Sequence, residues 1–237
     1  MKKNSFAISI VCLVFAVLFS AVLYRFARMS GFVASMAGAD GAPVIIVDAG
    51  HGGEDGGATA LDKSNEKDYN LEIALKLEQI LRLNGYNVIM TRRTDIMTCD
   101  DGLKKIRSRK VSDIHNRFRF MEEYPDALFV SIHQNKFSDT SQKGTQVFYS
   151  KNDPESSVLA DCIQKEIVGS LQKENKRMIK PSGTEIYLLY HAKSPAILVE
   201  CGFLSNYEDL QKLKNDEYKT QLALLIAKGI INYNSDR

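Results

Sequence analysis

Short apolar runs that alternate with amphipathic stretches constrain the fold of this chain more than anything else in its sequence. The most continuously apolar runs predict buried strands, which span 44–47, 86–90, 127–132 and 196–199. Two further strands are expected at 144–150 and 185–190. Helical periodicity predicts helices at 66–83, 158–171 and 218–231. This order predicts an α/β fold, a single domain with a mainly parallel twisted sheet and helices on both faces.

The first residues are expected to serve in targeting and not in this fold. Two lysines precede an uncharged apolar stretch from Phe6 to Tyr24, and a positive start before an apolar run is typical of export. The stretch is close to the ~20 residues that span a bilayer as a helix, so an uncleaved anchor and a cleaved signal both stay open. We predict a signal peptide or membrane anchor at 1–28, a linker at 29–42 and one domain at 43–237.

Charge and cysteine usage exclude two classes of protein. The formal net charge is only +2, which is too mild to indicate a nucleic-acid partner. The four cysteines form no C-x-x-C pair, and Cys12 lies in the apolar N-terminal stretch. The odd number that remains argues against a disulfide framework. Cys201 follows an apolar run, which favours buried packing over a role as a nucleophile.

A glycine-rich segment, residues 48–58, follows the first predicted strand and allows tight turns and close approach to a ligand. A phosphate-binding turn is excluded because the spacing is not G-x-G-x-x-G and because Glu54 and Asp55 would repel phosphate. A plain surface turn would explain the glycines but not His51 at the end of a strand. We therefore expect this segment to belong to a functional site.

Further polar residues lie where ligands bind in parallel sheets, beyond the carboxyl ends of the strands. His133 ends the third long strand, Glu200 ends the last one, and Glu66 begins the first helix. Two imidazoles and one carboxylate are a suitable set for zinc, with a fourth position left for water. The other carboxylate would then act as a general base. The residues alone do not decide which glutamate binds the metal.

The chain resembles the zinc-dependent N-acetylmuramoyl-L-alanine amidases of the amidase_3 type. The motifs that carry the resemblance occur in family order, from about Val44 to the C-terminus, at 44–53, 66, 91–95, 131–135 and 195–206. The resemblance implies that His51, Glu66 and His133 hold one Zn²⁺ ion and that Glu200 is the catalytic carboxylate. It also implies that 43–237 is the catalytic domain. The chain departs from the family at Gln134, where a small residue is common, and at Tyr190, where arginine is frequent.

This resemblance implies hydrolysis of the amide between the lactyl group of N-acetylmuramic acid and L-alanine in peptidoglycan. A membrane segment with a bare catalytic domain is most similar to members that modify spore cortex towards muramic-δ-lactam for germination. That role implies an exported enzyme, anchored or secreted, in the space between forespore and mother-cell membranes. The expected partners are glycan strands and an activating or targeting protein at the membrane. The alternatives are a zinc peptidase that cuts within the stem peptide and a non-catalytic or partner-dependent wall-binding protein.

Other charged residues have two interpretations each. Three charged residues follow the second strand: Arg92, Arg93 and Asp95. They could form a charged, solvated strand end, or they could include a structural Arg–Asp pair near the site. The basic stretch 104–119 is expected to be a solvated helix face, with attraction of anionic wall polymer or a partner as the alternative. His115 and His191 are expected to be structural or surface residues.

Overall fold

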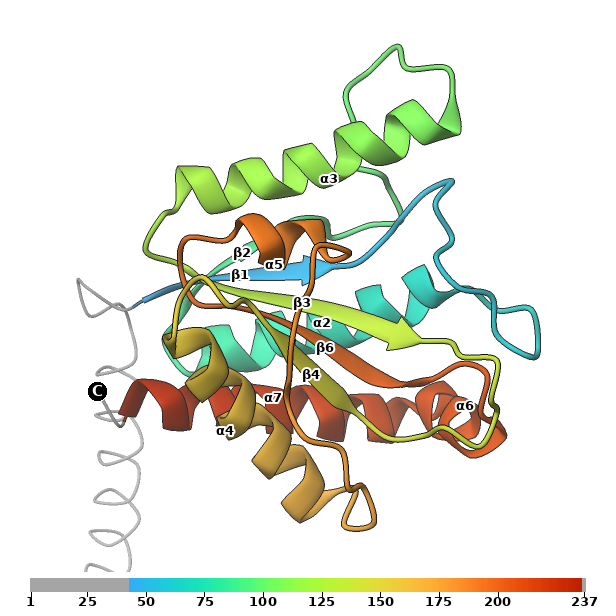
Figure 1. The fold of residues 1–237 in the computed structure, drawn as a ribbon, viewed down its shortest axis with the longest axis vertical. Helices are drawn as coiled ribbons and strands as arrows, with labels where there is room; N and C mark the ends of the chain where they lie inside the picture. The colour runs from blue at the N-terminus through green and yellow to red at the C-terminus, as the bar shows by residue number, and fades with distance from the viewer. Residues whose placement is uncertain (1–42, 236–237) are drawn as a thin grey trace, which may run out of the picture. The chain divides into compact units, whose positions relative to one another are not determined.

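Six strands form one sheet within residues 43–235, the part of the chain that the structure, a computed structural model, describes. They are β1 (Val44–Ala49), β2 (Asn87–Met90), β3 (Leu128–Asn135), β4 (Gln146–Tyr149), β5 (Lys180–Pro181) and β6 (Ala196–Phe203). The order across the sheet is β2-β1-β3-β6-β4-β5 (Figure 1). Strands β2, β1, β3 and β6 are parallel, whereas β4 runs antiparallel to β6. The prediction of a mainly parallel sheet is confirmed.

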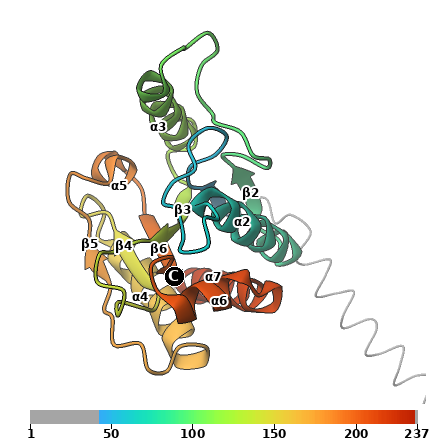
Figure 2. The ribbon, with the colours of Figure 1, turned by 90° about the vertical axis from the view of Figure 1, so that its right-hand side faces the viewer.

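Helices cover the sheet on both faces. They are α2 (Glu66–Leu83), α3 (Ile106–Glu123), α4 (Glu155–Ser170), α5 (Tyr187–His191), α6 (Tyr207–Lys214) and α7 (Asp216–Ser235). Helices α2, α4, α6 and α7 pack on one face, and α3 and α5 lie on the other (Figure 2). The alternation of side chains along β3 explains this arrangement, because Val130 and Ile132 face the first layer while Phe129 faces the second.

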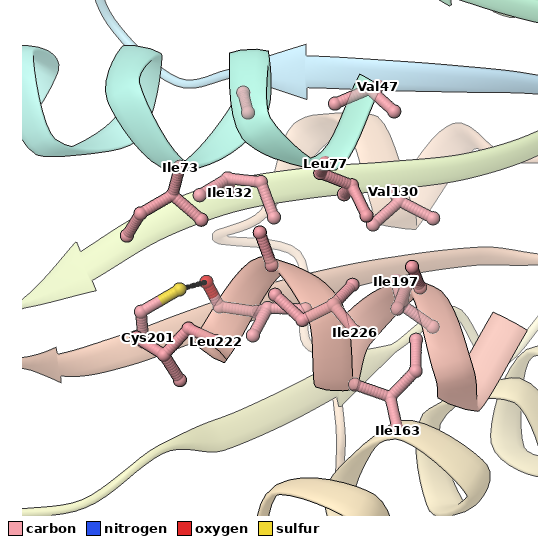
Figure 3. Packing of buried hydrophobic residues seen from close by; sticks show 14 of the residues in the cluster. Val47, Ile73, Leu77, Val130, Ile132, Ile163, Ile197, Cys201, Leu222 and Ile226 are labelled. Carbon is pink, nitrogen blue, oxygen red and sulfur yellow. Dashed lines mark hydrogen bonds between the residues drawn. The ribbon is translucent and has the colours of Figure 1, made fainter. Parts of the chain in front are cut away.

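The larger apolar core lies under α2, α4 and α7. Leu77 of α2, Ile163 of α4 and Ile226 of α7 belong to the same cluster as Val130 of β3, and none of the four has exposed surface (Figure 3). Full burial of such a side chain contributes about 1.5–3 kcal/mol. Cys201 joins this core with 1% of its surface exposed, which confirms its prediction as a packing residue. The core thus fixes the strands whose ends carry the polar residues of interest.

The strand predicted at 185–190 is wrong, because this segment forms a turn followed by helix α5. Leu188 and Leu189 are both buried against the sheet face that α3 also covers. Adjacent residues of a strand would point in opposite directions, whereas one helical turn can bring both side chains to the same layer. The neighbouring edge of β4 is taken instead by β5, which the sequence did not indicate.

The solvated helix expected at 104–119 corresponds to α3, which is partly exposed but buries Asp113, Arg117 and Met121. Arg117 is 2% exposed and pairs with two buried carboxylates, Asp48 of β1 and Asp113 of α3. Its guanidinium also donates to the carbonyl oxygens of Ala49 at 2.7 Å and of His51 at 2.6 Å. Burial opposes the charge of Asp48, but Arg117 together with hydrogen bonds from Ser131 and Thr91 holds the pKa of Asp48 below its usual value. Arg117 therefore fastens α3 to the end of β1.

The predicted targeting helix at 1–28 and the predicted linker at 29–42 lie outside the described residues. Within residues 43–235, none of the helices is long and apolar enough to cross a membrane. The domain boundaries stay a prediction.

We expect Arg117→Met to lower the free energy of unfolding by about 3–5 kcal/mol, because it leaves buried carboxylates without their counter-ion. The measurement is urea denaturation followed by circular dichroism. Lys165→Met, which removes an exposed helix-surface pair with Asp161, serves as the control and should leave the transition unchanged. A loss below about 1 kcal/mol for Arg117→Met would contradict a buried, essential ion pair.

Candidate active site

The segment after β1 turns back sharply so that its histidine enters the site. His51 has a positive φ of 61°, a conformation that costs energy for a residue with a side chain. The preceding Gly50 packs directly against His133, since a Cβ at this glycine would lie 2.2 Å from His133 Nε2. Only a glycine permits this approach, which explains one of the glycines in the segment.

Three side chains from three different elements form a group that can hold a metal ion. His51 follows β1, Glu66 begins α2 and His133 lies near the end of β3, and their ligand atoms all lie within 4.8 Å of one another. His51 Nε2 lies 3.3 Å from Glu66 Oε2, and His133 Nδ1 lies 2.8 Å from Glu66 Oε1. The two imidazoles therefore converge on one carboxylate.

Glu66 is held in place by hydrogen bonds as well as by the two histidines. The backbone amide of Ala58 donates to Oε2 at 2.8 Å, and the amide of Gln134 donates to Oε1 at 3.2 Å. The Asn70 side chain adds a bond to Oε1 at 3.2 Å. Burial would raise the pKa of Glu66, but the two histidines hold it far below its usual range. Glu66 is thus a fixed anion at the centre of the group.

The pKa of His51 is shifted in the opposite direction from that of Glu66. Burial alone would lower its pKa, but hydrogen bonds to Asp55 and Glu66 outweigh burial and raise the pKa to about 9. The two carboxylates around His51 therefore favour positive charge at this position. Two imidazoles and a carboxylate are also the donor types that zinc prefers, so the residues present fit this ion.

Glu200 lies beside the group on the neighbouring strand. It pairs in register with His133 across β3 and β6, so the two side chains are neighbours on the same face of the sheet. Within the described residues, its Oε2 atom is buried without a hydrogen-bond partner. Burial raises the pKa of Glu200 to about 7, with Glu66 adding to the shift and the two histidines opposing it. A half-buried carboxyl whose inner oxygen has no partner among the described residues, next to a metal-binding group, is suited to accept and return a proton.

The four residues expected at the carboxyl edge of the sheet thus lie together there. The residues that support them were not identified as such from the sequence. Arg92 is neither a solvated strand end nor part of an Arg–Asp pair, because it is buried and donates to the carbonyls of Ala49 and Gly50 at 2.9 and 3.0 Å. Asp95 pairs with Lys67 instead, at 2.6 Å. Buried basic residues in a charged stretch give no sequence signal, because the carbonyls that they bind come from distant segments.

Gln134 departs from the family pattern yet fits the site. Its side chain is 3% exposed and donates to Asn70 Oδ1 at 3.2 Å, and Asn70 in turn donates to Glu66 and to the Gly50 carbonyl. The larger side chain therefore joins the network behind Glu66. His115 and His191 are exposed and lie outside the His51, Glu66 and His133 group, in agreement with their prediction as structural or surface residues.

A mainly parallel sheet with a His–Glu–His group and a neighbouring glutamate at its carboxyl edge fits the class of α/β metallohydrolases. The sequence profile of the Amidase_3 family, N-acetylmuramoyl-L-alanine amidase, matches residues 45–232. The chain belongs to this family of enzymes. The match confirms both the resemblance found in the sequence and the prediction of an amidase.

Individual relatives agree with this assignment. The chain is 34% identical over 194 residues to the germination-specific N-acetylmuramoyl-L-alanine amidase of Bacillus subtilis, which covers 82% of this chain and 81% of the relative. It is 38% identical to the CwlD amidase of Clostridioides difficile, solved in complex with the GerS lipoprotein, with a TM-score of 0.79 over 82% of this chain and 100% of that one. AmiC2 of Nostoc punctiforme is 28% identical, with a TM-score of 0.69 over 83% of this chain and 99% of that one.

We expect the purified chain to bind one zinc ion and His51→Ala to lose it, because two of the three ligand atoms cannot hold the ion tightly. Zinc content after dialysis, measured by mass spectrometry of the metal, is the test. Zinc at 100 times its dissociation constant should stabilise the wild-type fold by about 2.7 kcal/mol. His115→Ala is the matched control and should bind zinc as the wild type does. Equal zinc content in both variants would contradict the assignment.

Proposed function

We propose that this enzyme uses one zinc ion to hydrolyse the amide that joins the lactyl group of N-acetylmuramic acid to L-alanine in peptidoglycan. One juxtaposition carries the proposal, the convergence of His51, Glu66 and His133 beside the unpartnered carboxyl of Glu200. In this proposal the first three residues are the zinc ligands. Glu200 is the catalytic carboxylate.

A zinc ion held by His51, Glu66 and His133 would supply Lewis acidity, which polarises a carbonyl oxygen and lowers the pKa of water. Glu200 supplies the proton transfers. Its carboxylate takes a proton from the attacking water and returns it to the departing nitrogen of alanine, so that the amine leaves uncharged. Its place beside His133 on the adjacent strand brings the carboxyl next to the metal-binding group, and its buried Oε2 has no competing partner among the described residues.

The wall that we propose as substrate is spore cortex, where the product would proceed to muramic-δ-lactam needed for germination. The support is the likeness to the germination-specific amidase of Bacillus subtilis and to CwlD. A cell-wall amidase acts outside the cytoplasm. We further propose that residues 1–28 anchor or export this one, and that it works between the forespore and mother-cell membranes.

Two other functions make different predictions. A zinc peptidase with the same metal group would cut within the stem peptide and leave L-alanine attached to muramic acid. A non-catalytic wall-binding protein would bind zinc and wall without turnover. The buried Oε2 atom of Glu200 has no hydrogen-bond partner among the described residues, and this favours a hydrolase over a binding protein, because burying an unpaired polar atom costs stability.

We expect the purified enzyme with zinc to release peptides that begin with L-alanine and to leave muramic acid free of peptide. Glu200→Gln should still bind one zinc ion, because the ligands are intact, but should lose at least about 10²-fold in turnover through the missing proton transfer. Mass spectrometry of products from cortex and from vegetative peptidoglycan is the measurement. Cleavage inside the stem would support the peptidase, and full activity of Glu200→Gln would remove its assigned role.

A partner protein is also part of the proposal, because the CwlD structure holds the GerS lipoprotein. We expect a membrane lipoprotein to raise the activity of this enzyme on cortex fragments. The test compares initial rates with and without the candidate lipoprotein from the same organism, and a wall-unrelated lipoprotein is the control. Full activity of the isolated enzyme, unchanged by the lipoprotein, would show that no activating partner is needed.

A further inference from the structure

We propose that Asp55 is a positioning residue for His51, which fixes the tautomer of this histidine so that Nε2 faces the metal, and that Lys110 of α3 holds Asp55 in place. The proposal rests on the zinc site of the proposed function. It assigns a role to a loop carboxylate that is not itself one of the three ligands.

The two nitrogens of His51 have different neighbours. Nδ1 lies 2.8 Å from Asp55 Oδ2, on the side away from the metal-binding group. Nε2 lies 3.3 Å from Glu66 Oε2, on the side of the group. A neutral imidazole carries one proton, and a carboxylate can only accept it. Asp55 therefore keeps the proton on Nδ1 and leaves the lone pair of Nε2 for the ion, an arrangement that also makes the histidine a stronger ligand.

Asp55 is itself rigidly placed. The ammonium of Lys110 lies 2.6 Å from Oδ1, and the amide of Gly57 donates to the same oxygen at 3.3 Å. Its backbone is paired with Gly52 through two hydrogen bonds of 3.0 Å, and only 8% of its surface is exposed. Oδ1 of Asp55 thus interacts with Lys110 and Gly57, and Oδ2 is left to bind His51.

The second histidine is positioned by other means. His133 presents Nδ1 to Glu66, and its ring packs over Gly50, where no Cβ fits. The two ligands therefore use different nitrogens, and the carboxylate of Asp55 acts on His51 alone. A substitution at Asp55 should weaken one ligand and leave the remainder of the group intact.

The same loop and helix provide a matched control. Glu54 and Arg109, each one residue before the proposed pair, form an ion pair at 2.6 Å between the same two elements. This neighbouring pair does not contact His51. Loss of Glu54–Arg109 reports on the general attachment of the loop to α3, whereas loss of Asp55–Lys110 also reports on the orientation of the histidine.

The experiment measures the dissociation constant of zinc by competition with a chromophoric chelator in the purified full-length enzyme. We expect Asp55→Ala to bind zinc about 100-fold more weakly and Asp55→Asn about 10-fold more weakly, since the asparagine oxygen still accepts a hydrogen bond but lacks the charge. Lys110→Met should cause a smaller loss in the same direction. Glu54→Gln and Arg109→Met should keep the wild-type constant, and circular dichroism of the metal-free proteins checks that all are folded.

The tautomer itself is read from the ¹⁵N shifts of the His51 ring in the zinc-loaded protein. The wild type should show a protonated Nδ1 and a metal-bound Nε2, and in Asp55→Ala the Nδ1 proton, without its acceptor, should exchange faster with water. A zinc constant for Asp55→Ala equal to that of the wild type, or an equal loss in Arg109→Met, would overturn the proposal. Failure of the wild type to bind zinc at all would instead refute the proposed function, so the two outcomes are distinct.

Discussion

The buried guanidinium of Arg117 is the contact on which the rest of the site depends. It lies between Asp48 of β1 and Asp113 of its own helix, and it binds the carbonyl oxygens of Ala49 and His51. A loop that approaches a ligand closely cannot form regular backbone hydrogen bonds, and buried carbonyls without partners are costly. Arg117 supplies those partners. It fixes the path of the segment that carries the first metal ligand.

A second buried arginine completes this support. Arg92 follows β2 and binds the carbonyls of Ala49 and Gly50, as well as the carbonyl of Lys67 in the first turn of α2. Two buried cations thus hold the backbone of the loop through its carbonyl oxygens. Two ion pairs, Glu54–Arg109 and Asp55–Lys110, also connect this loop to α3. The metal-binding group therefore depends on elements that supply none of its three ligands.

The contacts around the loop explain how the site can hold a strained residue in a fixed position. His51 has an unfavourable positive φ, which persists because the surrounding contacts determine it. His133 and Glu200, in contrast, lie on adjacent strands in ordinary sheet geometry, where the register alone places them side by side. The rigid sheet thus positions one histidine and the carboxyl, and the braced loop brings the other histidine to them. Hydrolytic chemistry requires such fixed geometry between an ion and a proton acceptor.

The sequence by itself determined the layers of this protein and the chemical identity of its site. Helix α2 spans the residues predicted for it, because its apolar residues recur at the helical period and Asn84 and Gly85 follow it. Four chemically distinctive residues at strand and helix ends indicated a metal centre, since parallel topology brings such ends to one edge. The short helix α5 was missed because Leu188 and Leu189 are consistent with either element until the sheet face against which they pack is known.

Only the tertiary structure decided what surrounds the ligands. The positions of Arg92, Arg117 and Asp55 depend on contacts between segments tens of residues apart, and a charged residue has the same sequence signature whether it is solvated or buried. The sequence also left open which glutamate lies between the histidines. The fold resolves this, because α2 brings Glu66 to both imidazoles while β6 places Glu200 beside them without a partner among the described residues.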